Sequence, residues 1–325
     1  MTVNLDTILL LALPASGKSE VRKYLEGLSP AQCREELHLG PTVQLDDFPY
    51  VHLMQRIDAE LVGLGQPRMF FHGPDKPFQD PRDWQVLIEL LNEDYANLFG
   101  LPMQAWSACA QALFQRFDGA RARIGAPPLL GTLPKDTRRQ LEIRLEKESA
   151  ALHTNLRAAR PGTLDGKTLV IEFARGGADG SAMPLPPPFG YASSIPLLAP
   201  AILERACVLY IWVTPEESRR KNQARTDPND PGSILHHGVP LEVMLHDYGC
   251  DDIEHMVATS GRPDTLRVAA YGRDYYLPVA RIDNRTDKTS FIRKPRDQWV
   301  PAEVDALHAE LAAGFARLHR QNQHR

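Results

Sequence analysis

The residues with the clearest chemical meaning lie near the start of the chain, in the segment Ala12-Leu-Pro-Ala-Ser-Gly-Lys-Ser19. This segment matches the pattern G-x-x-x-x-G-K-[ST], with Ala12 in place of the first glycine. A phosphate chain needs backbone N–H donors, a mobile cation and a helix N-terminus, and such a loop between a strand and a helix supplies all three. The motif therefore predicts a nucleotide-phosphate site formed by Pro14, Ala15, Ser16, Gly17, Lys18, Ser19 and Glu20.

Two side chains of this motif have separate expected roles. We expect Lys18 to meet the β- and γ-phosphates of a nucleoside triphosphate, and the Ser19 hydroxyl to ligate Mg²⁺. The alternative is a Gly-Lys-Ser turn that occurs by chance between a buried strand and a helix. The methyl group of Ala12 is expected on the strand side of the loop, away from the ring of N–H donors.

The segments on either side of the motif have the pattern that it requires. Thr7 to Leu13 is a continuous apolar run, which is typical of a strand buried on both faces. Lys18 to Leu28 predicts an amphipathic helix, and Thr42 to Leu45 predicts a second strand. A strand, a helix and a strand in this order form a βαβ unit, which indicates a parallel sheet.

Helical and strand patterns continue to the end of the chain. Residues 51–160 predict a helical insertion, after which strands and helices alternate again. The whole chain, 1–325, is therefore expected to form one α/β domain with a doubly wound, mainly parallel sheet. The helices expected within the insertion cover 84–99, 103–123 and 135–160. The later expected elements are strands at 169–171, 208–213 and 277–282 and helices at 214–224 and 302–318.

The motif and its surroundings resemble the P-loop kinases of small metabolites, which are the relatives of uridine, gluconate and adenylate kinases. The resemblance depends on Leu13-Pro-Ala-Ser-Gly-Lys-Ser19, the helix after it, and a strand followed by Asp46-Asp-Phe-Pro-Tyr50. It covers the sheet core and not the insertion at 51–160. It implies ATP or another nucleoside triphosphate as the phosphoryl donor, Mg²⁺ as the cofactor and a small molecule as the acceptor.

The resemblance gives a role to the acidic pair that follows the second strand. In such kinases a carboxylate at this place faces the acceptor hydroxyl, and here that role falls on Asp46 or Asp47. A carboxylate beside the phosphate site can orient a hydroxyl and take its proton during phosphoryl transfer. The alternative is that the pair only caps a helix that begins near Pro49.

A second acidic position follows the third expected strand. Glu172 is placed like the Walker-B acid that holds Mg²⁺ directly or through water, although that acid is usually Asp. The alternative is a strand-end carboxylate with no metal role. Next in the chain, Arg175 and the turn at Gly176-Gly177 could contact a phosphate.

A basic helix follows the fourth expected strand. Thr214, Pro215 and Glu217 form a good helix start, because a threonine cap is followed by proline and then by an acid. In the resembled kinases this region is a lid whose arginines neutralise the transferred phosphoryl group, so we expect Arg219 and Arg225 to act there. A solvated basic face is the alternative interpretation.

The composition limits the class of protein. The 325 residues are 43% hydrophobic, and 37 Lys and Arg against 41 Asp and Glu give a net charge of −4. This balance argues against a protein that coats nucleic acid. Cys33, Cys109, Cys207 and Cys250 are far apart, and the apolar run from Ile8 to Leu13 is much shorter than a membrane helix. We therefore expect a cytoplasmic protein without a membrane partner.

These features together predict an ATP- and Mg²⁺-dependent kinase that phosphorylates a hydroxyl or phosphate group of a small molecule. Two other functions are consistent with the same core. One is a nucleotide-hydrolysing switch that acts through a protein partner, and the other is a toxin-type or polynucleotide-end kinase. A switch needs no acceptor carboxylate, and a polynucleotide kinase needs a basic groove that the charge balance does not favour.

Overall fold

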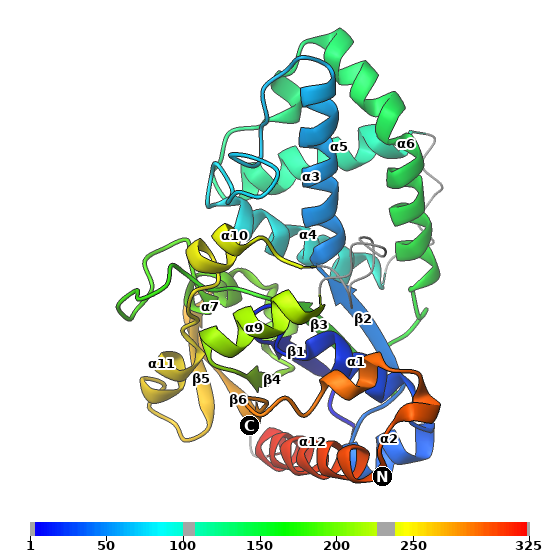
Figure 1. Ribbon diagram of the computed structural model, residues 1–325, viewed down its shortest axis with the longest axis vertical. Coiled ribbons are helices and arrows are strands. Elements are labelled where there is room, and N and C mark those ends of the chain that lie inside the picture. The colour runs from blue at the N-terminus through cyan, green and yellow to red at the C-terminus, as the bar shows by residue number, and fades with distance from the viewer. Residues whose placement is uncertain (1–3, 100–107, 226–237, 324–325) are drawn as a thin grey trace.

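The core of the fold is a six-stranded sheet in the order β2-β3-β1-β4-β6-β5 (Figure 1). The computed structural model describes residues 4–99, 108–225 and 238–323 of the chain. Neighbouring strands are parallel except for β5 and β6, which pair antiparallel at one edge. The protein therefore has the α/β class expected from the sequence, with a mostly parallel sheet. The strands are β1 (Thr7–Leu11), β2 (Thr42–Asp46), β3 (Thr168–Phe173), β4 (Ala206–Trp212), β5 (Thr265–Ala270) and β6 (Arg273–Asp283).

Helices occupy most of the connections between these strands. None of the helices in the described residues is both long and apolar enough to cross a membrane. The helix expected at 103–123 is described only from Cys109, because its first residues lie outside the described ranges. The helices before β3 are α1 (Lys18–Glu26), α2 (Pro30–Leu37), α3 (Phe48–Gly63), α4 (Asp83–Asn97), α5 (Cys109–Arg123) and α6 (Lys135–Ala158). Those after β3 are α7 (Tyr191–Ser194), α8 (Pro200–Leu203), α9 (Pro215–Arg225), α10 (Leu241–His246), α11 (Ile253–Ala258) and α12 (Pro301–Asn322).

The expected start of α9 is confirmed, whereas the hairpin of β5 and β6 was not expected. The backbone N–H of Glu217 donates to Oγ1 of Thr214 at 3.2 Å, as a threonine cap requires. The hairpin turns at Tyr271 and Gly272, whose φ angles are 52° and 74°. Two positive φ angles are typical of a two-residue hairpin turn, but Asn or Asp is the usual first residue. A tyrosine in that position hides the turn from sequence analysis.

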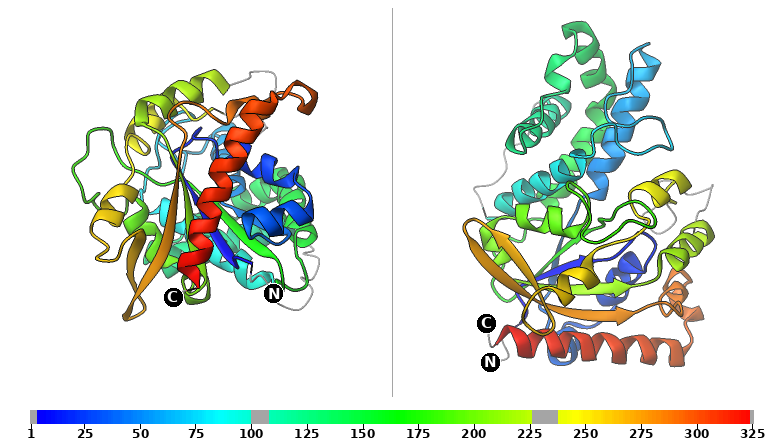
Figure 2. Two further views of the ribbon diagram at one scale, coloured as in Figure 1. Left: turned by 90° about the horizontal axis from the view of Figure 1, so that it is seen from below. Right: turned by 90° about the vertical axis from the view of Figure 1, so that its left-hand side faces the viewer.

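Helices cover both faces of the sheet, which explains the unbroken apolar run of β1. Ile8 and Leu10 lie in the apolar cluster of α1, α2 and α12. Leu9 and Leu11 lie in the cluster of α4, α8 and α11. Figure 2 shows α12 extended along one face of the sheet. Since side chains alternate along a strand, burial on both faces requires apolar residues at successive positions.

The segment between β2 and β3 is helical and has an apolar core of its own. Helices α3, α5 and α6 extend away from the sheet at the top of Figure 1, and Leu53, Phe114 and Leu141 pack in their core. Helix α4 belongs to both parts, because Ile88 packs with the sheet cluster and Leu87 with the helical cluster. This region contains the insertion expected at 51–160, and α4 attaches it to the sheet.

A close approach of two backbones places β2 against β3. Gly40 precedes β2, and its N–H donates to Oγ1 of Thr168 at the start of β3, at 2.9 Å. A Cβ atom on Gly40 would lie 2.0 Å from the carbonyl oxygen of Gly166. The same pairing brings Asp46 opposite Glu172 at the other end of the two strands. Only glycine fits at position 40 without moving β2 away from β3.

We therefore predict that Gly40→Ala destabilises the protein by about 1–3 kcal/mol, the usual cost of forcing a methyl group into a filled space. Urea unfolding followed by circular dichroism measures the free energy of unfolding. Gly119→Ala is the matched control, because Gly119 is inside α5 and its Cβ would meet only Nη1 of Arg123, at 3.6 Å. The control should be as stable as the wild type or more stable. Equal stability of both variants would contradict the assigned role of Gly40.

Candidate functional site

Residues 12–17, which with Lys18 and Ser19 carry the P-loop pattern and are called the P-loop segment below, join β1 directly to α1. Gly17, the residue before α1, has φ 108°, and a Cβ there would lie 2.5 Å from Oγ1 of Thr289 and 2.7 Å from Nδ2 of Asn284. Both its conformation and its close neighbours therefore require glycine. Among the described residues no side chain caps α1, so this helix N-terminus can offer N–H donors to an external acceptor. The positive end of the helix dipole lies at the same place.

Three side chains from distant parts of the chain hold this loop in place. The hydroxyl of Tyr191 accepts from the N–H of Ala12 and donates to its carbonyl, both at 3.0 Å. Ser218 on α9 donates to the carbonyl of Pro14 at 2.7 Å. Asn284 donates to the carbonyl of Ser16, also at 2.7 Å. Sequence analysis missed these contacts, because no pattern connects residues so far apart in the chain.

Lys18 lies beside the loop and beside the acidic residues. Its ammonium group donates to the carbonyl oxygens of Ala12 and Leu13 at 3.0 and 3.3 Å. Its charge also lowers the pKa of both Asp47 and Glu172, against the larger effect of their burial. The lysine is thus a buried cation at the mouth of the loop, as the motif predicts for a phosphate ligand.

Two strand-end carboxylates share one guanidinium group. Asp46 ends β2 and stands opposite Glu172 of β3. Nη1 of Arg22, one turn after Lys18 in α1, donates to Asp46 at 2.9 Å and to Glu172 at 2.8 Å. Burial raises the pKa of both acids, and the guanidinium opposes this rise. Arg22 therefore stabilises two negative charges that would otherwise be costly to bury.

Asp47 occupies the cap position of α3 but does not cap it. No side-chain cap bond forms at α3, whereas Oδ1 of Asp46 accepts from the N–H of Phe48 at 2.8 Å. Oδ2 of Asp47 accepts from Nη1 of Arg175 at 2.7 Å, and Nη2 of Arg175 donates to the carbonyl of Trp84 at 2.9 Å. Within the described residues, Oδ1 of Asp47 accepts no hydrogen bond. The helix-cap alternative thus fits Asp46 better than Asp47.

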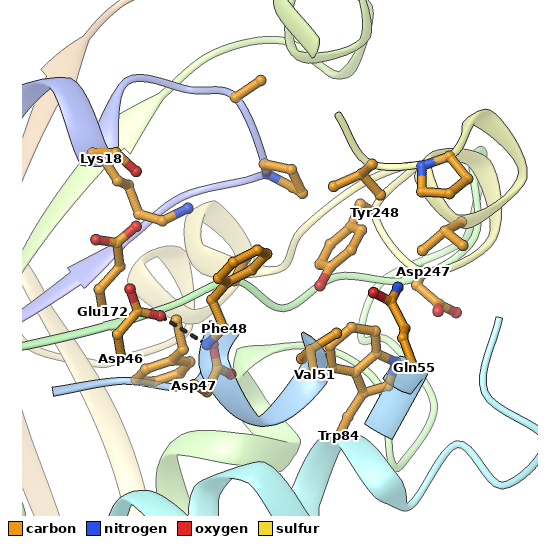
Figure 3. A pocket seen from close by; sticks show the side chains of 18 of the residues that line it. Lys18, Asp46, Asp47, Phe48, Val51, Gln55, Trp84, Glu172, Asp247 and Tyr248 are labelled. Atoms are coloured by element: carbon orange, nitrogen blue, oxygen red, sulfur yellow. Dashed lines mark hydrogen bonds between the residues drawn. The ribbon is translucent and has the colours of Figure 1, made fainter. Parts of the chain in front are cut away.

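A single pocket brings most of the expected site residues together. All of the expected phosphate-binding residues except Ser16 line it, as do Asp46, Asp47 and Glu172. Figure 3 shows Lys18, Asp46 and Glu172 at one end of the pocket. Gln55, Trp84, Asp247 and Tyr248 lie at the other end, with Phe48 and Val51 between the two groups. Sequence analysis did not identify this second end.

The basic residues of α9 do not line this pocket. Arg219 lies 3.4 Å from Glu216 and 3.5 Å from Asp179, and Arg220 is exposed and pairs with Glu217 at 2.6 Å. Arg225 ends α9, and its side chain is outside the described part of the structure. In this state the arginines of α9 that the structure describes contact acids, and their expected role in phosphoryl transfer stays a prediction.

Arg175 also differs from expectation, because it does not face the phosphate end. Its side chain is buried behind the pocket wall, 5.2 Å from the ring of Trp84 and 5.3 Å from that of Phe173. With Asp47 as its ion-pair partner, it supports the wall and neutralises an acid. The whole Arg175 side chain is buried because of tertiary packing. The glycine-rich sequence after it predicts only a loop, so this burial could not be predicted from the sequence.

The side-chain oxygens that line the pocket suit Mg²⁺, which takes only one or two ligands from the protein. They do not suit a metal whose ligands all come from the protein. In the described parts of the chain, no three His, Cys, Asp or Glu side chains are grouped to hold a metal ion. The Ser19 hydroxyl and the Glu172 carboxylate both line the pocket. Mg²⁺ is commonly bound by one or two protein oxygens together with substrate phosphates and water. These two residues therefore fit the metal that the motif implies.

We predict that Arg22→Met destabilises the protein more at high pH than at low pH. The folded-state pKa of Asp46 and of Glu172 is already above the unfolded value, and loss of the cation raises both further. The folded protein then binds more protons than the unfolded chain, so its stability decreases as the pH rises through these pKa values. The deficit at pH 8 should be about 3 kcal/mol, at the lower end for a broken buried ion pair.

Urea unfolding at pH 5 and pH 8 measures this difference. Arg22→Lys keeps a cation at the same place and should lose much less stability. A deficit that is the same at both pH values would mean that Arg22 contributes through packing and not through charge.

Comparison of the chain with protein-family models, with curated protein sequences and with solved structures found no match. The function of the pocket is therefore inferred from its own residues and geometry.

Proposed function

We propose that this protein is an ATP- and Mg²⁺-dependent phosphotransferase that phosphorylates a hydroxyl or phosphate group of a small molecule. One observation carries the proposal: the P-loop segment after β1 opens into the same pocket as Asp46, Asp47 and Glu172. This pocket lies beyond the carboxyl ends of parallel strands, where ligands bind in open α/β sheets. Phosphoryl transfer needs little covalent chemistry from the protein and depends on positioning and charge neutralisation.

The phosphate end of the pocket offers the groups that a triphosphate requires. The N–H groups at the start of α1 bind phosphate oxygens, and Lys18 moves from the carbonyls of Ala12 and Leu13 to the β- and γ-phosphates. Ser19 and Glu172 hold Mg²⁺, which supplies neutralisation of the phosphate charge. Arg22 opposes the rise in the pKa of Glu172 that burial causes, and so favours the ionised form that a metal ligand requires.

Asp47 is the better of the two candidates for the acceptor. Both oxygens of Asp46 accept hydrogen bonds, from Phe48 and from Arg22, whereas Asp47 has one oxygen that accepts none among the described residues. That oxygen can orient the acceptor hydroxyl and take its proton. Burial raises the pKa of Asp47, which makes the carboxylate a stronger base than an exposed aspartate.

The second end of the pocket favours a kinase over a nucleotide-hydrolysing switch. A switch needs space for a nucleotide and one water molecule, but this pocket continues past the carboxylates to Gln55, Trp84 and Tyr248. Arg219 and Arg225 on α9 are proposed to approach the transferred phosphoryl group when both substrates are bound. Cations that arrive at this stage stabilise the transition state more than the ground state.

We predict that Lys18→Ala abolishes turnover and leaves the fold intact, because it removes the cation that meets the β- and γ-phosphates. ADP release in the presence of a metabolite mixture measures turnover, and calorimetry measures ATP affinity. Lys23→Ala is the matched control, since Lys23 is in the same helix but does not line the pocket. A folded Lys18→Ala protein with unchanged rate and unchanged ATP affinity would exclude the proposed nucleotide site.

We predict that Asp47→Asn and Asp46→Asn have different effects. Asp47→Asn should lower acceptor-dependent phosphorylation by about 10²–10⁴-fold, the usual contribution of a general base, with ATP affinity nearly unchanged. Asp46→Asn removes a charge that Arg22 neutralises, and should mainly change stability and the Mg²⁺ concentration that gives half-maximal rate. Full activity of Asp47→Asn together with a lower melting temperature would show that Asp47 is structural.

A further inference from the structure

The end of the pocket away from Lys18 combines aromatic rings with polar groups. Trp84 of α4 and Tyr248, which follows α10, have ring centroids 5.3 Å apart in an edge-to-face arrangement. Gln55 of α3 and Asp247 lie at the same end in Figure 3. The amide of Gln55 offers both a donor and an acceptor. These residues form a second, non-phosphate subsite, which we call the ring subsite.

Asp247 is the polar residue of the ring subsite with unused hydrogen-bonding capacity. Its residue is only 2% exposed, and its Oδ1 pairs with Nδ1 of His246 at 2.5 Å. Among the described residues no donor meets the distance and angle of a hydrogen bond to its buried Oδ2, although the Trp84 side chain is near enough to lower the pKa of the carboxyl. Burial raises the pKa of this carboxyl, and His246 and the Trp84 side chain oppose the rise. An unsatisfied buried carboxylate oxygen is costly, so a ligand that donates a hydrogen bond there recovers free energy.

The charges of the described residues around the ring subsite disfavour an anionic ligand. Among the described residues that line the pocket, the cations are Lys18 and Lys76. Lys18 is at the phosphate end, and Lys76 is half-exposed and paired with Glu242. Arg175 lies behind the wall and is neutralised by Asp47. Among the described residues, a phosphate or carboxylate in the ring subsite would therefore meet Asp247 with no cation to balance it.

We propose that the acceptor is a small hydroxylated ring compound without negative charge. Its apolar ring face lies on Trp84 and Tyr248, and one of its hydroxyl or protonated amino groups donates to Asp247. This assignment rests on the proposed kinase function and narrows it, because it excludes phosphorylated and carboxylated acceptors. Flat apolar faces stack on aromatic rings, and hydroxyl or ammonium groups are the natural donors to a buried carboxylate.

The transfer step follows from these positions. The acceptor oxygen forms a bond to the γ-phosphorus while the bond from that phosphorus to the β–γ bridging oxygen breaks. The hydroxyl proton passes to Asp47, and ADP leaves with the electron pair of the broken bond. The products are ADP and the phosphate ester of the ring compound, so no oxidant or further reactant is needed.

The first experiment compares matched acceptors with the full-length protein. The probes are glucose, glucosamine, myo-inositol and uridine, each tested beside gluconate, glucose 6-phosphate or uridine monophosphate as the anionic counterpart. ADP release and product mass are measured, and ATP binding is measured separately. Phosphorylation of uncharged or amino probes and not of the anionic ones supports the proposal.

Phosphorylation of an anionic probe overturns the assignment and leaves the kinase function standing. The same holds if ATP binds in a Lys18-dependent way and no probe of either kind is phosphorylated. If ATP does not bind at all, the proposed function itself fails. The two failures are thus distinguishable.

The second experiment tests Asp247 with whichever probe is phosphorylated. Asp247→Asn keeps the side-chain shape and an oxygen for His246, and should raise KM for the acceptor at least ten-fold with KM for ATP unchanged. The increase should be larger for an amino probe than for a neutral one, because a charge-assisted hydrogen bond is lost. Asp305→Asn on the exposed side of α12, which does not line the pocket, is the control and should change neither constant. Equal KM values for Asp247→Asn and the wild type would overturn the role of Asp247.

Discussion

The site depends on one constraint, the burial of three carboxylates at the carboxyl ends of β2 and β3. Asp46, Asp47 and Glu172 are all in a region where ionisation is costly, and burial raises the pKa of each. Arg22 neutralises two of them, and Arg175 neutralises the third. Without these guanidinium groups the pKa of each acid would be higher still, and the carboxylates would be less suited to the metal-binding and proton-accepting roles proposed for them.

The same ion pairs also connect the parts of the fold. Arg22 extends from α1 to the ends of β2 and β3, so the helix that carries the P-loop is fixed against the acidic edge. Arg175 extends from the end of β3 to Asp47 and to the carbonyl of Trp84 in α4. The helical segment before β3 is therefore held at the site by a buried charge. These contacts and the packing of α4 on the sheet set the distance between the Lys18 end of the pocket and the ring subsite.

Much of the sheet could be predicted from the sequence, since burial on both faces leaves a continuous apolar run in β1, and Pro14 and Gly17 mark a break after it. The P-loop residues and the acidic positions Asp46, Asp47 and Glu172 could be found for the same reason, because strand ends are visible in the pattern. Arg22 and Ser218 could not, because each contacts a residue that is distant in the sequence. Asp247 could not, because only the folded chain brings it to the same pocket as Asp46 and Glu172. The position of Arg175 after the third strand could be predicted. The direction of its side chain toward Asp47 could not, because it depends on tertiary packing.

The two ends of the pocket are built from different kinds of structure, and this has a consequence for specificity. The phosphate end consists of backbone N–H groups and charged residues fixed by the β1–α1 junction and the β2–β3 register. The ring subsite consists of side chains from α3 and α4 and from the residues after α10, none of which belongs to a strand. A substitution at Gln55 or Tyr248 changes the shape offered to an acceptor without altering the sheet register or the guanidinium pairs. In the proposed kinase, acceptor choice would therefore depend mainly on side chains of helices and loops, and phosphate chemistry on the strand ends, with Arg175 linking the two through the carbonyl of Trp84.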